Sequence, residues 1–350
     1  MIYQMRMKNN LSNYLFLIVL FSAFISCKKD KNISDKEPEF YYAGYSYNQS
    51  YQEANRKAIL SIGDSIVQLS PNNRSDATAI YVHNSDVHIT GYQHNGTDKK
   101  RVVYWKNSQI MHLSDAFEYN KGTAIFADNA NVYVAGTVYE IFEHQGEKRN
   151  VPYQYVWVNG TFKQKYGAME FSGINYFAPY NGKLYMAGQF AQRATLWNEN
   201  SMETLSSNAS GADYIKVING DTYVIGWEGV NIETDAVSVW KNKEKVFTNT
   251  LGKRISSVAA TMDGQDYYYA ANFGGTTFTA SVYKNDQLLY NLSEGTNVKV
   301  EAIQVYNRKV YVLGQLLNGT QSTPTLWEDG VPKTLFPAGK KIYLHDFIIR

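Results

Sequence analysis

Three of the chain's six histidines lie close together, and imidazoles are common metal ligands and proton carriers. His83, His88 and His94 follow one another at intervals of five and six residues. The local pattern places His83 beside a turn, His88 within a strand and His94 in the next loop, near the other end of that strand. Imidazoles so placed do not surround one ion, so we predict no metal site and no cofactor.

Asp115 could act with Glu118 or Glu170 as an acid and base pair of the glycosidase kind if their carboxyl groups converge. The open alternative is that these are solvated loop carboxylates, which is their commoner role. The sequence has no His-Glu-x-x-His or Gly-x-Ser-x-Gly motif, no phosphate-binding glycine loop and no calcium-binding run of Asp and Asn. Catalytic signals are sparse, and no catalytic residue is predicted.

The only cysteine, Cys27, follows an apolar run from residue 14 to residue 25 that is preceded by Arg6 and Lys8. This run is short for a bilayer span and has the layout of a secretory signal. Residues 24–27, Phe-Ile-Ser-Cys, resemble the lipobox of bacterial lipoproteins, with Phe in place of the usual Leu. The resemblance implies a signal peptide over 1–26, a lipid on Cys27 and an anchor in the cell envelope, in the outer membrane, facing the periplasm or the exterior.

The charge balance argues against a nucleic-acid partner. Without residues 1–26, 32 of the 34 Lys and Arg residues remain against 32 Asp and Glu residues, so the mature chain is formally neutral. Nucleic-acid binding normally requires a basic excess or a basic stripe. Residues 27–39 are polar, charged and contain proline, which is typical of a flexible tether.

From residue 40 onward one phrase recurs seven times, a short strand that ends in Tyr-x-x-Gly followed later by a Trp-x-Asn turn. The Tyr position is His once, at His88, and the Gly position is Ala once, at Ala271. Intervals between successive Gly positions run from 38 to 52 residues, which matches the roughly 40 to 50 residues of a four-stranded propeller blade. The Gly positions are 44, 91, 136, 188, 226, 271 and 314.

Each unit divides into four strands, which we call a to d. In the second unit these are expected over 78–82, 87–90, 102–105 and 109–113, from their period-two patterning and the turn residues between them. Asn suits both hairpin turns because it tolerates a left-handed backbone. The expected a-to-b turn residues are Asn84, Asn129, Asn181, Asn219 and Asn307. The expected c-to-d turn residues are Asn107, Asn159, Asn242, Asn285 and Asp329.

The two ends of the repeat region predict how the fold closes. The first unit begins at a b strand, residues 40–44, and the sequence ends with an a strand, residues 342–350. We therefore predict an all-β fold over 40–350, a seven-bladed β-propeller of four-stranded antiparallel blades, closed by pairing the C-terminal strand with the N-terminal blade. The phrase resembles propeller repeats in general and lacks the signatures of WD40 and kelch repeats.

Large aromatic side chains recur at one position of strand c. Wedge-shaped blades leave a widening gap that flat side chains fill, so we expect these residues to pack between blades, with ligand contact as the alternative. They are Trp105, Trp157, Trp197, Trp240, Tyr283 and Trp327.

In such a ring the b-to-c and d-to-a connections share one rim, and the start of strand b at Phe40 lies on the opposite face. The third unit has the longest Gly-to-Trp gap, 21 residues, which predicts a projecting loop that offers apolar side chains to a partner. The alternative is that this loop folds onto the next blade. Ligand-binding candidates in this loop and around the rim are Tyr47, Tyr139, Phe142, His144, Arg149, Arg74, Asp115, Glu118, Tyr119 and Arg254.

These features predict a binding or scaffold module for an extracytoplasmic protein or glycan. The alternative is a propeller enzyme, a hydrolase or lyase acting on polysaccharide or peptide through carboxylates at the mouth of the central tunnel. A third reading, a structural subunit of an outer-membrane assembly, predicts an apolar patch on the outer wall of the ring.

Overall fold

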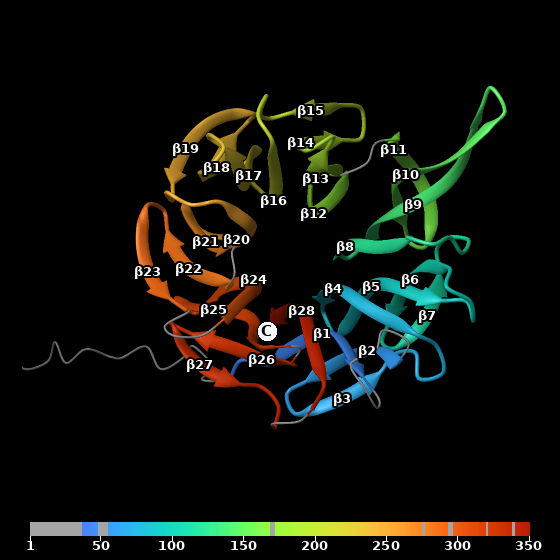
Figure 1. The fold of residues 1–350 in the computed structure, drawn as a ribbon, viewed down its shortest axis with the longest axis horizontal. Helices are drawn as coiled ribbons and strands as arrows, with labels where there is room; N and C mark the ends of the chain where they lie inside the picture. The colour runs from blue at the N-terminus through green and yellow to red at the C-terminus, as the bar shows by residue number, and fades with distance from the viewer. Residues whose placement is uncertain are drawn as a thin grey trace, which may run out of the picture. The chain divides into compact units, whose positions relative to one another are not determined.

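The computed structural model describes residues 37–47, 55–168, 172–274, 277–292, 297–319, 321–337 and 340–350. Glu39–Arg350 forms one compact unit that contains the 28 strands found in these ranges. The strands form seven sheets of four, arranged in a ring (Figure 1). Cys27, the predicted signal peptide and most of the predicted tether lie outside the described residues. Within the described ranges we find no helix suited to crossing a membrane.

The blades are numbered in chain order, and each is given from its inner strand a to its outer strand d. Blades 1 to 3 contain β28 (Ile342–Ile349), β1 (Phe40–Tyr47), β2 (Arg56–Ile62), β3 (Ser65–Gln68); β4 (Ser75–His83), β5 (Asp86–His94), β6 (Lys100–Lys106), β7 (Gln109–His112); and β8 (Lys121–Ala127), β9 (Val132–His144), β10 (Glu147–Val158), β11 (Thr161–Ala168). Blades 4 and 5 contain β12 (Gly173–Tyr180), β13 (Lys183–Phe190), β14 (Arg193–Asn198), β15 (Met202–Thr204); and β16 (Ser210–Ile218), β17 (Asp221–Gly229), β18 (Asp235–Lys241), β19 (Glu244–Thr250). Blades 6 and 7 contain β20 (Ile255–Asp263), β21 (Asp266–Phe273), β22 (Thr279–Lys284), β23 (Gln287–Asn291); and β24 (Asn297–Tyr306), β25 (Lys309–Asn318), β26 (Gln321–Glu328), β27 (Val331–Thr334).

The predicted closure is confirmed. β28 pairs with β1 along its length, from Phe40 opposite Ile349 to Ser46 opposite Ile342. Beyond the strands, the main chains of Glu39 and Arg350 exchange two hydrogen bonds of 2.9 and 3.0 Å. The last strand thus supplies the inner edge of the first blade and leaves no blade open.

Asparagine turns make the hairpins, largely as predicted. All five c-to-d turn residues have positive φ, from 47° at Asn107 to 53° at Asn285. Their side-chain oxygens also accept a main-chain N–H from strand b, for example 2.8 Å from Val87 to Asn107. Asn129 lies in the a-to-b turn where it is predicted, between β8 and β9, but unlike the other four it does not have a positive φ. There Asp128 caps the turn by accepting the N–H groups of Ala130 and Asn131 at 2.8 Å each.

The repeated glycine is required by a β-bulge in the neighbouring strand a. In blade 5 the register shifts between Ala212 and Tyr214, directly opposite Gly226. A Cβ atom on Gly226 would lie 1.9 Å from a main-chain carbonyl oxygen. In blade 6 the bulge lies nearer the strand start, between Ile255 and Ser257, which explains how Ala271 is tolerated there.

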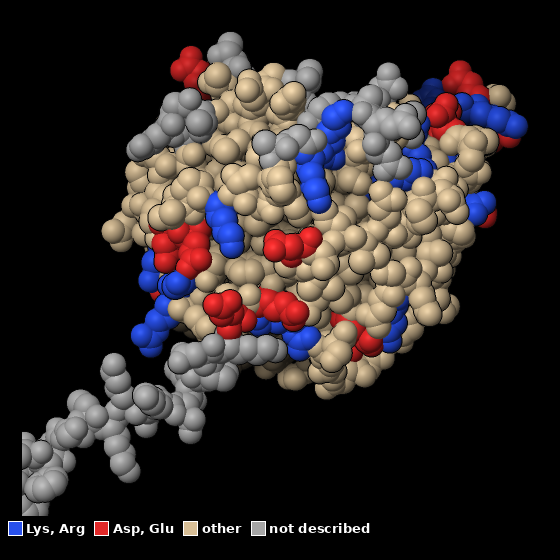
Figure 2. Space-filling model, turned by 90° about the horizontal axis from the view of Figure 1, so that it is seen from below, with Lys and Arg blue, Asp and Glu red and all other residues tan. Residues whose placement is uncertain are grey.

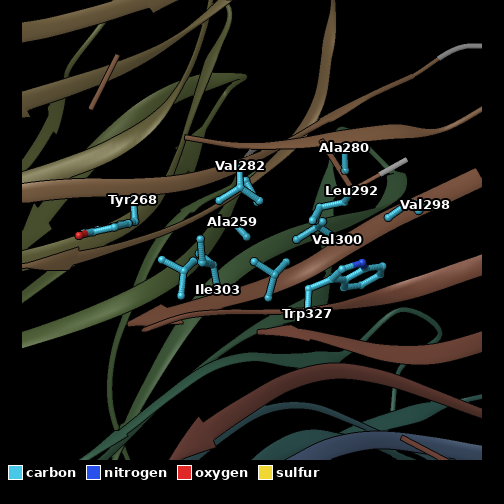
Figure 3. Close-up of a cluster of buried hydrophobic side chains, with 12 residues drawn as sticks. Ala259, Tyr268, Ala280, Val282, Leu292, Val298, Val300, Ile303 and Trp327 are labelled. Carbon is cyan, nitrogen blue, oxygen red and sulfur yellow. The ribbon is translucent and has the colours of Figure 1, made fainter. Parts of the chain in front are cut away.

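The c-strand tryptophans are buried between blades, which confirms the packing prediction. Trp105, Trp197 and Trp240 are at most 1% exposed. Figure 3 shows one such core, in which Val282 of blade 6 faces Val300 and Trp327 of blade 7. On the side of the ring shown in Figure 2, basic and acidic side chains are interspersed and do not segregate by sign.

Candidate functional site

The ring has two faces of different construction. The a-to-b and c-to-d turns form one face, which we call the turn face, and the b-to-c and d-to-a connections form the other, the rim face. The carbonyl of Phe40 accepts the N–H of Gly63 in a c-to-d turn at 3.2 Å, so the chain enters blade 1 at the turn face. The candidate residues from the sequence lie on the rim face.

The projecting segment of blade 3 is a long β-hairpin and not a loop (Figure 1). β9 and β10 pair continuously from Tyr133 opposite Val158 to His144 opposite Glu147. Gln145 and Gly146 close it with φ angles of 52° and 81°, the signs required by a type I′ turn. The hairpin, defined here as residues 139–152, extends well beyond its neighbouring strands, because β8 pairs only with residues 132–137 of β9 and β11 only with residues 153–158 of β10.

One side of the hairpin forms a shallow hollow. Phe142, His144, Arg149 and Tyr153 contribute to its lining, and its volume is about 480 Å³. The Phe142 ring is 50% exposed and stacks on His144 with centroids 6.3 Å apart. Arg149 forms an exposed 2.8 Å ion pair with Glu147. The hollow thus combines an aromatic platform with polar groups of both signs.

The other side of the hairpin is braced at its base. Tyr139 lies 6.3 Å from Phe117 and 5.4 Å from Tyr119, centroid to centroid, and its N–H donates to Asn120 Oδ1 at 2.8 Å. Further out, Ile141 is 60% exposed. The base is therefore fixed by packing, while apolar groups nearer the tip face solvent.

The remaining candidates do not converge. Asp115 and Glu118 are exposed, and among the residues that the structure describes neither carboxylate forms an ion pair, while Glu170 lies outside that set. Arg74 donates from Nε to His94 Nε2 at 2.6 Å, at the junction of blades 1 and 2. Arg254 lies 3.3 Å from the buried Asp235 at the junction of blades 5 and 6.

The three histidines have separate partners. His83 Nε2 lies 2.8 Å from Asn129 Oδ1, and His88 Nδ1 lies 2.7 Å from the Tyr104 hydroxyl. Burial lowers the pKa of His88 to about 4. Over the described ranges, no three His, Cys, Asp or Glu side chains are placed to hold one metal ion.

A second polar group, which we call the mouth cluster, lies where blades 7, 1 and 2 meet at the rim end of the channel. Arg56 donates to Asp76 and to the Tyr92 hydroxyl at 3.1 Å each and lies 4.0 Å above the Tyr45 ring. His345 lies 3.2 Å from Asp76. The predicted candidate Tyr47 packs edge-on against Tyr45 at 5.3 Å.

The cluster continues across the stacked rings of Tyr45 and Tyr343, whose centroids are 5.4 Å apart. The Tyr343 hydroxyl donates to Glu301, which also pairs with Lys299 at 2.8 Å. Burial alone would lower the pKa of His345, but the Asp76 carboxylate outweighs it and raises that pKa. Burial, followed by the charge of Glu301, raises the pKa of Tyr343. Two members of the mouth cluster, Glu301 and His345, line the channel.

The bulge residues line the central channel, which encloses about 390 Å³. Five of them stand 13 positions before the repeated glycine: Thr78, Thr123, Asn175, Asp213 and Glu301. Sequence reasoning missed this ring. Its signal is a polar residue at a fixed place in an otherwise apolar inner strand.

Two channel carboxyls are strongly perturbed. Burial raises the pKa of Asp213 to about 7 and that of Asp346 to about 6. Asp346 still accepts the N–H groups of Ile80 and Phe347 at 3.0 and 2.8 Å. One oxygen of Asp213, Oδ2, is buried without a hydrogen-bond partner.

The fold and site define a seven-bladed β-propeller, and comparisons with known proteins agree on the fold. No family model and no curated protein matches the sequence. The β-propeller domain of the Trilobed protease from Pyrococcus furiosus superimposes with a TM-score of 0.51 at 8% identity, covering 86% of this chain and 95% of that one. That propeller has an open velcro topology, whereas here β28 closes the ring.

A second solved structure, Pyrococcus horikoshii acylaminoacyl peptidase, gives a TM-score of 0.50 at 11% identity, covering 85% of this chain and 50% of that one. This chain therefore spans about half the length of that peptidase. At such identities the likeness concerns the fold alone.

Proposed function

We propose that this protein is a lipid-anchored binding module of the bacterial cell envelope that holds an extracytoplasmic partner on its rim face. The hairpin 139–152 is its principal contact. The observation that carries the proposal is that this hairpin stands clear of the ring with Ile141 60% and Phe142 50% exposed. Exposed apolar anchors flanked by charged pairs are the usual centre of a protein-binding surface, so we favour a protein partner over a glycan.

The point at which the compact unit begins supports this arrangement. The compact unit begins at Glu39, hydrogen-bonded to Arg350 on the turn face. A lipid on Cys27 would thus attach upstream of the face opposite the hairpin, and the rim face would stay free for a partner. The third reading, an outer-wall patch, has less support, because the exposed apolar side chains of the outer strands are distributed over all seven blades. They are Val67, Ile110, Met111, Phe162, Met202, Val246, Leu288 and Val331.

The test uses the soluble unit 39–350 in a pull-down from envelope extract and on a glycan array. Phe142→Ala should weaken capture of the partner by about tenfold or more, because a central aromatic anchor carries much of the binding energy. Phe162→Ala is the matched control, since this phenylalanine of β11 is 53% exposed but distant from the hairpin tip. Equal capture by wild type and Phe142→Ala contradicts the proposal, and retention on the glycan array alone reassigns the ligand class.

A second candidate function is a propeller enzyme acting on peptide or polysaccharide. The favouring observation is the mouth cluster, where His345 and Asp76 lie 3.2 Å apart and near them Glu301 accepts from the Tyr343 hydroxyl. The two solved structures named above are a protease propeller and a peptidase. Hydrolysis of a peptide or polysaccharide library that is lost in His345→Gln, with stability retained, would establish this function.

A further inference from the structure

Side-chain hydrogen bonds or ion pairs join neighbouring blades around the channel at six of the seven junctions. In three successive blades the bulge residue donates to a main-chain carbonyl of the next blade. Thr78 donates to Gly122, Thr123 to Ile174 and Asn175 to Ala212, at 2.8, 2.7 and 3.0 Å. Each acceptor is the residue paired with the repeated glycine of its own blade. One contact is thus repeated from blade to blade.

Elsewhere the same acceptor position is served by another donor. Asn272 of β21 donates to Val300 at 2.8 Å, and Gln315 of β25 donates to Leu344 at 3.0 Å. Between blades 1 and 2 the ion pair of His345 with Asp76 takes this place. Six of the seven junctions are therefore tied by a recorded donor or ion pair at this level.

The junction of blades 5 and 6 is the exception. Its bulge residue is Asp213, and the equivalent acceptor is the carbonyl of Val258, which lies opposite Ala271. An ionised carboxylate only accepts hydrogen bonds, so two acceptors would face one another. Asp213 Oδ2 is buried and has no partner, which fits a missing hydrogen on this side of the contact.

We propose that Asp213 keeps its proton in the folded ring and donates a hydrogen bond to the Val258 carbonyl. The stability of the junction between blades 5 and 6 then depends on the protonation of Asp213. The neutral carboxyl then donates a hydrogen bond to the next blade, as the amide of Asn175 does one blade earlier. Release of the proton leaves a negative charge beside the carbonyl oxygen of Val258 and weakens this junction alone.

Among the residues that the structure describes, no cation is paired with Asp213. On the neighbouring inner strands the titratable groups are Tyr214 and Lys216 of β16, Tyr176 and Tyr180 of β12 and Asp263 of β20. Lys216 donates to the Met262 carbonyl at 3.0 Å. Across the channel stand Glu301, His345 and Asp346. Within the described part of the chain none forms an ion pair with Asp213. The raised pKa of Asp213, caused by burial, agrees with a protonated carboxyl.

The experiment compares urea unfolding of the wild type and Asp213→Asn, both as the unit 39–350, from pH 5 to pH 8.5. Asn donates at every pH. As the pH rises from 5 toward 7, the ratio of the wild-type to the variant folding constant should therefore fall by up to about tenfold per pH unit, and above pH 7 it should level off. Asn175→Asp is the matched gain variant and should introduce the same dependence at blades 4 and 5. Parallel pH curves for wild type and Asp213→Asn overturn the proposal.

Two further measurements keep the proposal open to refutation if a variant fails to fold. Infrared spectra of wild type labelled with ¹³C at Asp carboxyls should contain a protonated carboxyl at pH 7, which lies above the raised pKa of Asp346, and an entirely ionised spectrum overturns the proposal. Methylammonium chloride or calcium chloride, added at pH 8.5, should leave the wild-type folding constant unchanged relative to an equal ionic strength of sodium chloride. A specific gain would assign the site to a bound cation instead.

Discussion

At the scale of single residues, His345 and Asp76 tie the last strand of the chain to the second blade. Asp76 is 3% exposed and is approached by Arg56 at 3.1 Å and His345 at 3.2 Å. A buried carboxylate needs such partners, since its charge has lost its hydration. The pair therefore joins blades and holds an imidazole at the channel mouth.

This pair predicts a pH response. Because Asp76 raises the pKa of His345, its stabilising effect is fully present below pH 6.5, the ordinary value, and is lost as the pH rises through the higher folded value. Asp76→Asn should shift the NMR titration midpoint of the His345 ring to lower pH. His112, whose pKa burial lowers, is the internal control and should not move. An unmoved His345 midpoint would show that Asp76 does not set its charge.

At the scale of the structural element, the bulge in strand a and the glycine in strand b form one unit. The bulge turns one polar side chain toward the channel and brings two main chains too close for a Cβ atom. The repeated Tyr-x-x-Gly motif therefore marks, in the sequence, the bulge that turns a polar side chain into the channel. Ala271 shows the dependence, since it occurs where the bulge has moved.

Gly226→Ala tests this coupling. The added Cβ would lie 1.9 Å from the Gly211 carbonyl oxygen, so we expect a loss of about 1–3 kcal/mol in the free energy of unfolding. Gly229→Ala in the same strand is the control, because its nearest neighbour would be 3.4 Å away. Chemical denaturation measures both. Equal stabilities of the two variants would show that the bulge yields without strain.

The blades, the turns and the closure could be predicted from the sequence, because each has a local sequence signature, such as Asn at a left-handed turn. Less of the candidate site could be predicted. The long gap in blade 3 predicts a loop, although Gln145-Gly146 is itself a hairpin signal. The mouth cluster depends on residues up to 269 positions apart, such as Asp76 and His345, and only ring closure brings them together.

At the scale of the whole molecule, closure by β28 makes the ring cooperative. β28 supplies Ile342, Leu344 and Phe347 to the core shared by blades 7 and 1. Removing residues 342–350 should expose the edge of β1, lower the melting temperature and produce oligomers in size-exclusion chromatography. A synthetic peptide of residues 342–350 should restore the monomer. A truncated chain that stays monomeric with unchanged melting would mean that the ring does not need its last strand.

The hydrogen-bonded contact of Glu39 with Arg350 has a consequence for engineering and for evolution. The first and last residues of the compact unit lie side by side, so the chain could begin and end at another blade without changing the ring. A short peptide linker between these two residues permits circular permutation, with new ends cut at any surface turn. Because these two ends are adjacent, the whole domain could also be inserted into a loop of an unrelated host protein with little distortion of that loop.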